Sequence, residues 1–158
     1  MITFKKGNNK FNFRVAGIAI QDNRVLLHTT VKDDFWNLPG GRVEFNESTE
    51  QAILREIKEE LDVEVGSPKL LFINEDFFEY DSMQFHEIGF YYLVSFPEGH
   101  EITTYEDEFS GIEDEGRLIF KWFPVDELQD LEVYPEVLRS ELLQLTNSNH
   151  IQHFVNLR

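Results

Sequence analysis

Apolar residues in this chain follow two spacings, and the first of them predicts β-strands. Alternating or continuous apolar runs indicate strands over 11–20, 25–30, 69–80, 84–96 and 117–123. Turn-forming residues follow the first run, so we expect the first two strands to form a hairpin. The run from Ile88 to Val94 is apolar throughout, which is typical of a central strand. The first ten residues are polar and predict only a loose lead-in.

The second spacing predicts one amphipathic helix from Ser48 to Val63. An apolar stripe recurs at every fourth position, formed by Ile53, Ile57 and Leu61. Ser48 is a suitable N-cap residue, and Gln51 three positions later completes a capping box. The glycine pair Gly40-Gly41 precedes this helix, so the chain is expected to turn sharply before the helix begins.

Strands on both sides of a central helix, with further helix near the end, indicate an α/β (α+β) sandwich. A short helix is expected over 126–128 and a closing helix over 135–145, with Pro135 in its first turn. The tail over 150–158 gives no clear pattern. No linker or internal repeat divides the sequence, so we predict a single domain over 1–158.

Three glutamates crowd one face of the expected central helix. At about 100° per residue, Glu56, Glu59 and Glu60 fall within about 100° of one another. They repel one another and lie near the helix C-terminus, where the macrodipole favours cations. A bound cation would relieve both effects, and oxygen ligands suit Mg²⁺ or Mn²⁺. The alternative is a solvated acidic face, which is the usual meaning of a charge run.

The stretch from Gly41 to Val63 resembles the Nudix box. That family pattern is Gly, five residues, Glu, seven residues, Arg-Glu, an aliphatic residue, any residue, Glu-Glu, any residue, Gly and an aliphatic residue. The chain supplies the matching positions as Gly41, Glu47, Arg55, Glu56, Ile57, Glu59, Glu60 and Val63. The departure is Asp62, where the family has a Gly that ends the helix; Asp tolerates the left-handed conformation better than most residues.

The resemblance implies the Nudix fold, an α/β/α sandwich with a mixed sheet between helices. It also implies metal-dependent hydrolysis of a phosphoanhydride bond in a nucleoside diphosphate linked to another group. Mg²⁺ or Mn²⁺ on Glu56, Glu59 and Glu60 would neutralise phosphate charge and lower the pKa of a bound water. The Gly40 carbonyl is a further expected ligand by analogy with the family. Arg55 is expected to position a glutamate carboxylate.

The general base is left open between the helix and a downstream loop. The family takes its base either from the box, where Glu56 is the candidate, or from such a loop. Residues 98–116 hold eight acidic side chains and no Lys or Arg, and a loop of that length is usually functional or mobile. Glu115, with Glu113 as the alternative, is the loop candidate because both lie just before the strand that starts at Arg117.

Three side chains are candidates for contacts with the substrate. His28 lies at a strand end before the glycine turn, where it would contact a phosphate or simply serve as a structural histidine. Trp36 follows Phe35 and would stack on a base, although such a pair more often packs in a core. Tyr80 lies near the place where dinucleoside-polyphosphate-cleaving family members have a Tyr. Chance placement among 15 Phe and 5 Tyr would look the same.

Composition narrows the class of protein. The chain has 158 residues, of which 41% are hydrophobic, an ordinary globular composition. It has no cysteine for disulfides or thiolate metal sites, which fits a reducing cytoplasm. We expect no signal peptide and no membrane span. The net charge of −16 argues against binding duplex nucleic acid. It allows small phosphate substrates, because divalent cations reverse the local charge.

The sequence leaves the substrate open among dinucleoside polyphosphates, ADP-ribose, nucleotide sugars and (d)NTPs. A rival interpretation is a catalytically silent Nudix-fold domain that binds nucleotides as a regulator or scaffold. Such domains have lost box residues, whereas this chain keeps Arg55 and the three helix glutamates. A Ca²⁺-binding acidic protein would need the spaced Asp/Asn loop of an EF-hand, which the sequence lacks. The oligomeric state stays open, with a homodimer as one option.

Overall fold

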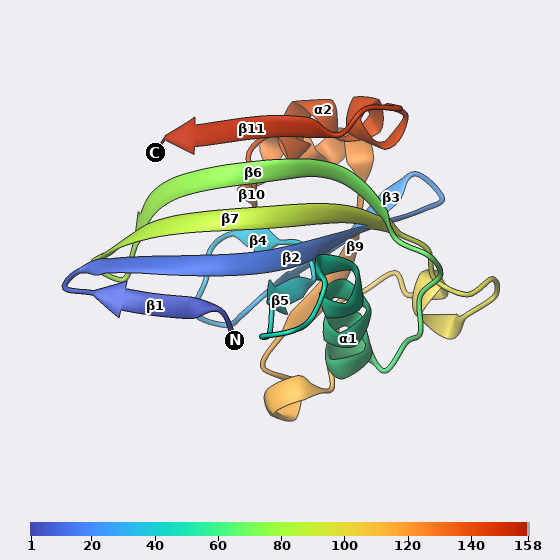
Figure 1. Cartoon of the computed structure of the whole chain (residues 1–158). Helices are drawn as coiled ribbons and strands as arrows, with labels where there is room; N and C mark the ends of the chain where they lie inside the picture. The colour runs from blue at the N-terminus through green and yellow to red at the C-terminus, as the bar shows by residue number, and fades with distance from the viewer. Residues whose placement is uncertain (158) are drawn as a thin grey trace.

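The computed structural model describes residues 1–157, which form a mixed sheet with helices on both faces (Figure 1). In chain order the elements are β1 (Thr3–Lys6), β2 (Asn9–Gln21), β3 (Arg24–Thr29), β4 (Trp36–Asn37), β5 (Gly40–Arg42), α1 (Thr49–Leu61), β6 (Lys69–Tyr80), β7 (Met83–Val94), the 3-10 helix η1 (Glu101–Thr104), β8 (Phe109–Ser110), the 3-10 helix η2 (Glu113–Gly116), β9 (Ile119–Pro124), the 3-10 helix η3 (Val125–Asp130), β10 (Val133–Tyr134), α2 (Leu138–Thr146) and β11 (Gln152–Leu157).

Strand β2 is the centre of the sheet. The strands run in the order β10, β4, β3, β2, β7, β6, β11, while β1 and β5 also pair with β2 and β9 pairs with β3. The β2–β7, β6–β11 and β4–β10 pairs are parallel. The pairs of β2 with β1, β3 and β5 are antiparallel, so the sheet is mixed. The predicted hairpin and the central position of β7 are both confirmed.

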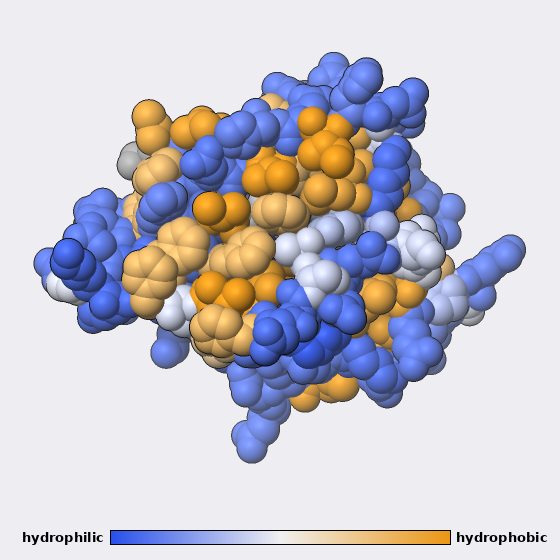
Figure 2. Space-filling model, in the orientation of Figure 1, coloured by the Kyte–Doolittle hydropathy of each residue, from blue (hydrophilic) through white to orange (hydrophobic). Residues whose placement is uncertain are grey.

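Side chains of β2 alternate between two cores, as a strand covered on both faces requires. Val15 and Ala19 pack with the apolar stripe of α1. Ala16 and Ile18 pack on the opposite face with α2 and η3. The predicted sandwich is therefore confirmed. Figure 2 shows apolar side chains on the part of the α1 face that this helix leaves uncovered, where Phe4 is 64% exposed.

Gly17 of β2 lets α1 lie close against the sheet. A Cβ at this position would be 3.1 Å from Ile57 Cδ1 and 3.3 Å from Ile53 Cδ1. The apolar stripe of α1 therefore sits directly on β2, and this contact fixes the helix relative to β5.

Four expectations from the sequence are corrected. The lead-in forms β1, which gains backbone hydrogen bonds along β2. The short helix over 126–128 is the longer 3-10 helix η3. The closing helix begins at Leu138 rather than Pro135. The tail forms β11, a parallel edge strand on β6.

The acidic segment 98–116 also has more structure than the predicted loop, because it contains η1, β8 and η2. Arg24 donates hydrogen bonds to the carbonyl oxygens of Thr103 and Tyr105. Trp122 Nε1 donates to the Ile102 carbonyl at 2.9 Å. These donors come from β3 and β9, so long-range contacts hold a segment whose local sequence predicts only a loop. None of the helices in residues 1–157 is long and apolar enough to cross a membrane.

Candidate active site

The glycine pair brings β5 into close contact with β2 on one side and α1 on the other. A Cβ at Gly40 would lie 2.1 Å from the Val15 carbonyl oxygen. A Cβ at Gly41 would lie 2.3 Å from Glu56 Cδ. The backbone of β2 leaves no room for a side chain at Gly40, whereas a side chain at Gly41 would displace the Glu56 carboxyl, so the turn holds its backbone directly against the acidic face of the helix.

The carbonyl of Gly40 is turned toward that face. Gly17 N–H donates to the Pro39 carbonyl at 2.8 Å, and Gly40 is the register partner of Ala16. Gly40 therefore occupies a non-hydrogen-bonded pair, in which its own N–H and C=O point away from β2. Its N–H reaches the Glu60 carboxyl. The Gly40 carbonyl points to the same side, so it does not accept a hydrogen bond from β2.

Local signals at both ends of α1 explain its limits. Ser48 and Gln51 form the predicted capping box, with Gln51 N–H donating to Ser48 Oγ at 3.1 Å. The helix ends at Asp62, which adopts the left-handed conformation at φ 56° and ψ 37°. Lys58 Nζ donates to Asp62 Oδ1 at 2.5 Å. Asp62 thus performs the helix-ending role that the family assigns to Gly.

Arg55 organises the outer part of the acidic face. Its Nε donates to Glu47 Oε1 at 2.7 Å, and its Nη2 to Glu47 Oε2 at 3.0 Å. Its Nη1 donates to Glu56 Oε1 at 2.8 Å and to Glu59 Oε2 at 3.1 Å. Nη2 also donates to the Arg42 carbonyl. These are the contacts that the expected positioning role of Arg55 requires, and the role itself stays a prediction.

Glu60 and Glu56 form the inner part of the face, under the glycine turn. Glu60 is 2% exposed, and its Oε2 has no hydrogen-bond partner among the described residues. Burial, followed by the neighbouring charges of Glu56 and Glu113, raises the pKa of Glu60 to about 8. Burial also raises the pKa of Glu56, although the hydrogen bond from Arg55 opposes this shift.

These donors fit a divalent cation but do not form a finished cage. Within residues 1–157, no three acidic or histidine side chains are gathered closely enough to hold a metal ion. Glu59 turns toward Arg55, and its side chain is 46% exposed. The two inner carboxyls and the free Gly40 carbonyl are hard oxygen donors, as Mg²⁺ or Mn²⁺ requires. The unpaired Oε2 of Glu60 is the position where such an ion would remove an unsatisfied buried group.

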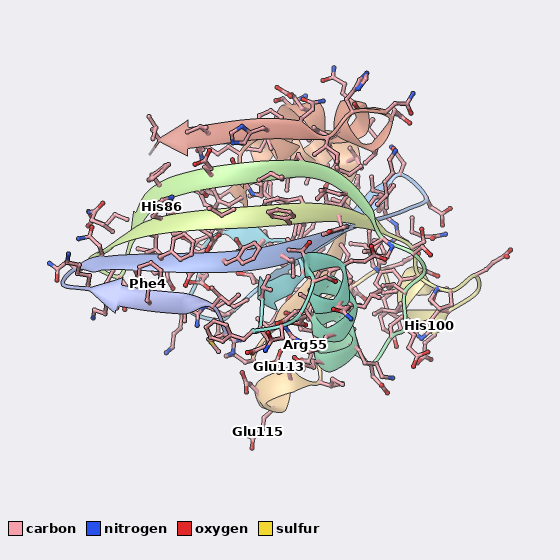
Figure 3. All side chains as sticks on the ribbon, in the orientation of Figure 1. Phe4, Arg55, His86, His100, Glu113 and Glu115 are labelled. Atoms are coloured by element: carbon pink, nitrogen blue, oxygen red, sulfur yellow. The ribbon has the colours of Figure 1, made fainter. Side chains whose placement is uncertain are left out.

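Of the two loop candidates for the base, the structure brings only Glu113 to the helix. Ile112 N–H donates to the Glu60 carbonyl at 2.9 Å, which fixes the start of η2 against α1. Figure 3 shows Glu113 beside Arg55, whereas Glu115 projects away into solvent. The charge of Glu113 contributes to the raised pKa values of Glu56 and Glu60. The geometry therefore favours Glu113 over Glu115, whereas the sequence favoured Glu115.

A cleft of about 450 Å³ runs from the glycine turn along the face opposite α1. Gly40, Gly41 and Glu60 lie at one end. Its other lining residues include Arg14, His28, Phe35, Tyr80, Phe85, Lys10, Arg42 and Arg117. The cleft therefore joins the candidate metal-binding groups to cationic and aromatic side chains, which suit phosphates and bases respectively.

His28 and Tyr80 both line this cleft in different environments, and their contact with a substrate stays a prediction. His28 is 9% exposed, and burial lowers its pKa to about 4, so its ring is neutral at pH 7. Tyr80 is 47% exposed, and its hydroxyl donates to Asp33 Oδ1 at 3.1 Å. The Phe35 ring lies edge-on to Tyr80, with centroids 6.1 Å apart.

Trp36 lies elsewhere. Its ring packs edge-on against Phe123 with centroids 4.7 Å apart, at the border of the core under α2. Phe35 and Trp36 are consecutive residues, and their side chains point to opposite sides of the strand. Phe35 therefore lines the cleft, and Trp36 packs against the core. The expected contact between Trp36 and a base is not supported by this placement.

Arg14 is a cleft residue that sequence reasoning missed. It lies in β2 between strands that pair on both sides, with its Nε 3.9 Å from Glu87 Oε1. The only local signal is an arginine inside an otherwise apolar strand. That signal does not reveal that β5 and β7 place the side chain next to the glycine turn.

The fold and the site together define the class of this protein. The NUDIX domain family model matches residues 11–143, and the chain belongs to that family. The structure is also similar to that of the mutator MutT protein from Bacillus halodurans, with a TM-score of 0.63 and 21% identity. That match covers 91% of this chain and 90% of the MutT chain. The predicted Nudix fold is therefore confirmed.

Relatives in sequence point the same way. The uncharacterized Nudix hydrolase YvcI of Bacillus subtilis is 28% identical over 127 residues, covering 77% of this chain and 72% of that protein. The 8-oxo-dGTP diphosphatase of Proteus vulgaris is 51% identical over 37 residues, or 23% of this chain. The chain matches only 33% of the length of that diphosphatase.

Proposed function

We propose that this protein is a divalent-metal-dependent pyrophosphohydrolase that cleaves a phosphoanhydride bond in a nucleoside diphosphate linked to another group. The observation that carries the proposal is the buried Glu60 carboxyl, which has an unpaired oxygen beside Glu56 and under the glycine turn. Leaving such a group buried without a partner is costly. A cation bound there offsets both the lost solvation and the repulsion between the two carboxyls.

Each side chain in the site has a distinct task in this proposal. Glu56, Glu60 and the Gly40 carbonyl hold Mg²⁺ or Mn²⁺, with Glu59 joining from the exposed edge. When bound, the metal neutralises phosphate charge and lowers the pKa of a coordinated water. Arg55 orients the glutamate carboxylates to which it donates hydrogen bonds.

Proton transfer and phosphate binding fall to groups around the metal-binding face. Glu113 accepts the proton of the attacking water, because η2 places it beside the inner glutamates. Arg14 neutralises a substrate phosphate in the cleft. His28 stays neutral at pH 7 and donates a hydrogen bond rather than a charge.

The proposed substrates are small nucleotides. Relatives carry names for different substrates, among them 8-oxo-dGTP in Proteus vulgaris and, for YjhB of Bacillus subtilis, ADP-ribose. In this chain Phe35 and Tyr80 offer an aromatic wall for a base in the cleft that Gly40 and Glu60 also line. The cytoplasmic location, the absence of duplex nucleic acid and membrane partners, and a homodimer stay predictions.

A substrate panel with product analysis tests the proposal. The protein is incubated with ADP-ribose, dinucleoside polyphosphates, nucleotide sugars and (d)NTPs in the presence of Mg²⁺, Mn²⁺ or EDTA. The 5′-phosphate products are measured under each condition. We expect metal-dependent cleavage of at least one member at an anhydride bond, and none by Glu60→Gln. Binding of a nucleotide without any turnover would instead support the silent regulator or scaffold.

A further inference from the structure

Arg14 carries its charge in the cleft beside another cation. It lines the cleft from β2, and its register partner in β5 is Arg42. Like charges opposite each other on neighbouring strands repel. On the other side of β2, the register partner of Arg14 in β7 is Gly89, which has no side chain. Neither direct neighbour across the sheet neutralises Arg14, so a counterion in the sheet has to come from a diagonal position.

Glu87 occupies that diagonal position. It lies two residues before Gly89 in β7, so its side chain points to the same face of the sheet. Glu87 is 7% exposed, and its Oε1 lies 3.9 Å from Arg14 Nε. Burial disfavours the charged form of Arg14, but the charge of Glu87, the strongest of the opposing influences, raises the pKa of Arg14. Glu87 is therefore the main negative partner of this cation.

The two side chains meet at one edge of the guanidinium. Nε is the Arg14 nitrogen at ion-pair distance from Glu87, and it is buried without a hydrogen-bond partner among residues 1–157. A distance of 3.9 Å is too long for a hydrogen bond. Glu87 thus neutralises Arg14 without accepting a hydrogen bond from it. The donors of the guanidinium therefore stay available to a phosphate in the cleft.

A row of hydrogen bonds across three strands fixes the Glu87 carboxylate. Thr3, Asn12 and Glu87 are successive register partners in β1, β2 and β7. Thr3 Oγ1 donates to Asn12 Oδ1 at 2.8 Å, so the Asn12 amide presents its Nδ2 to the next strand. That Nδ2 donates to Glu87 Oε2 at 3.3 Å. Oε1 is the oxygen that faces Arg14, so β1 supports a group of the candidate active site.

We propose that Glu87 is a positioning residue for Arg14, which it holds in the cleft in the orientation that binds a substrate phosphate. The assignment rests on the proposed function for its ligand, the phosphate chain of a nucleotide. It adds that the affinity for this anion depends on a buried carboxylate. A carboxylate that only faced the ligand would repel phosphate and weaken binding. The direction of the change when Glu87 loses its charge therefore distinguishes positioning from repulsion.

Calorimetric titration with ADP in EDTA measures this direction without metal or turnover. Glu87→Gln should weaken ADP binding about tenfold, within the range of coupling between residues in contact. The matched control is Glu75→Gln, because Glu75 lies in the neighbouring strand β6 on the opposite face, where it contacts His153 at 2.7 Å. This control should bind ADP within about twofold of the wild type. Tighter or unchanged ADP binding by Glu87→Gln would overturn the proposal.

A double-mutant cycle separates positioning from a general structural role. Arg14→Lys keeps the charge but loses the planar guanidinium, so it should weaken ADP binding about tenfold. Adding Glu87→Gln to Arg14→Lys should weaken binding by no more than about a further twofold, because Glu87 acts through the guanidinium. Losses that multiply to about a hundredfold would show that Glu87 acts independently of Arg14, which contradicts the proposal.

Steady-state kinetics with Mg²⁺ on the best substrate of the panel separate this inference from the proposed function. Glu87→Gln should raise KM about tenfold with kcat within about twofold, as expected for a group that binds substrate and transition state alike. Glu87→Asp keeps the charge on a shorter side chain and should raise KM less. If Glu87→Gln does not fold, an unchanged KM in Glu87→Asp overturns the inference. Weakened ADP binding without any wild-type turnover leaves the inference and rejects the hydrolase, whereas turnover with unchanged KM rejects the inference alone.

Discussion

The acidic face of α1 contains two regions with the same chemistry and opposite electrostatic states. In the outer region, Glu47 accepts two hydrogen bonds from Arg55, which lower its pKa. In the inner region, burial raises the pKa of Glu60 to about 8, and one of its oxygens has no partner. The outer carboxylates are satisfied by the protein alone. In the inner region the protein leaves Glu60 Oε2 without a partner among the described residues, so the surroundings rather than the residue type distinguish the two regions.

Arg55 connects the two regions, since one guanidinium contacts Glu47, Glu56 and Glu59. Its fork of donors fixes several carboxylates at once, as a planar guanidinium can and an ammonium cannot. Arg55 precedes Glu59 by four positions, which is the weaker order for stabilising a helix, so these contacts hold the carboxylates rather than support the helix.

The largest expected effect comes from removing the inner charge. Glu60→Gln keeps the shape of the side chain and should lower kcat by about 10²-fold or more, the scale lost with a main electrostatic group. The fold should persist, because the change relieves repulsion. Steady-state kinetics on the best substrate measure it, with exposed Glu50→Gln of the same helix as control. Near-normal turnover by Glu60→Gln would reject its role.

The next effect separates the two loop acids. Glu113→Gln should lower kcat by at least about tenfold with little change in KM, as expected for a group acting in the transition state. It should also flatten the acidic limb of the pH–rate profile. Glu115→Gln should leave both parameters within about twofold, because its side chain points into solvent. If both variants keep full activity, the base belongs to the helix and Glu56 becomes the candidate.

A smaller effect is expected in the outer region. Arg55→Lys keeps the charge but loses the simultaneous contacts to Glu47 and Glu56. We expect kcat to fall about tenfold and the free energy of unfolding to fall by about 1–2 kcal/mol. Urea unfolding and kinetics measure the two changes. Equal activity of Arg55→Lys and wild type would show that charge alone, and not the fork of hydrogen bonds, matters here.

Local sequence was sufficient for α1 but not for the division of its acidic face. Ser48, Gln51 and the apolar stripe act within a few residues of one another, so the helix and its cap were predictable. The burial of Glu60 depends on β5, which β2 holds in place. The core position of Trp36 and the position of Glu113 beside α1 could not be predicted for the same reason. Their surroundings come from Phe123 and from α1, which are distant in the chain.

The inner region should also make stability depend on pH. The pKa of Glu60 in the folded protein is about 8, above its ordinary value of 4.5. The folded state therefore holds this proton more tightly, and the free energy of unfolding of the metal-free protein should fall as pH rises from about 5 to 8. Glu60→Gln should flatten that decline. Chemical unfolding at several pH values in EDTA measures the slope, and equal slopes for the two proteins would contradict the raised pKa.

The most direct test of the central claim is a Mg²⁺ titration of thermal unfolding at pH 8, where Glu60 of the metal-free protein is partly ionised. A ligand that binds only the folded state raises Tm with its concentration. We predict that Mg²⁺ raises the Tm of the wild type at constant ionic strength, and that Glu60→Gln loses most of this response while Glu50→Gln keeps it. A wild-type Tm that does not change with millimolar Mg²⁺, or equal increases in all three proteins, would contradict a metal site at Glu60.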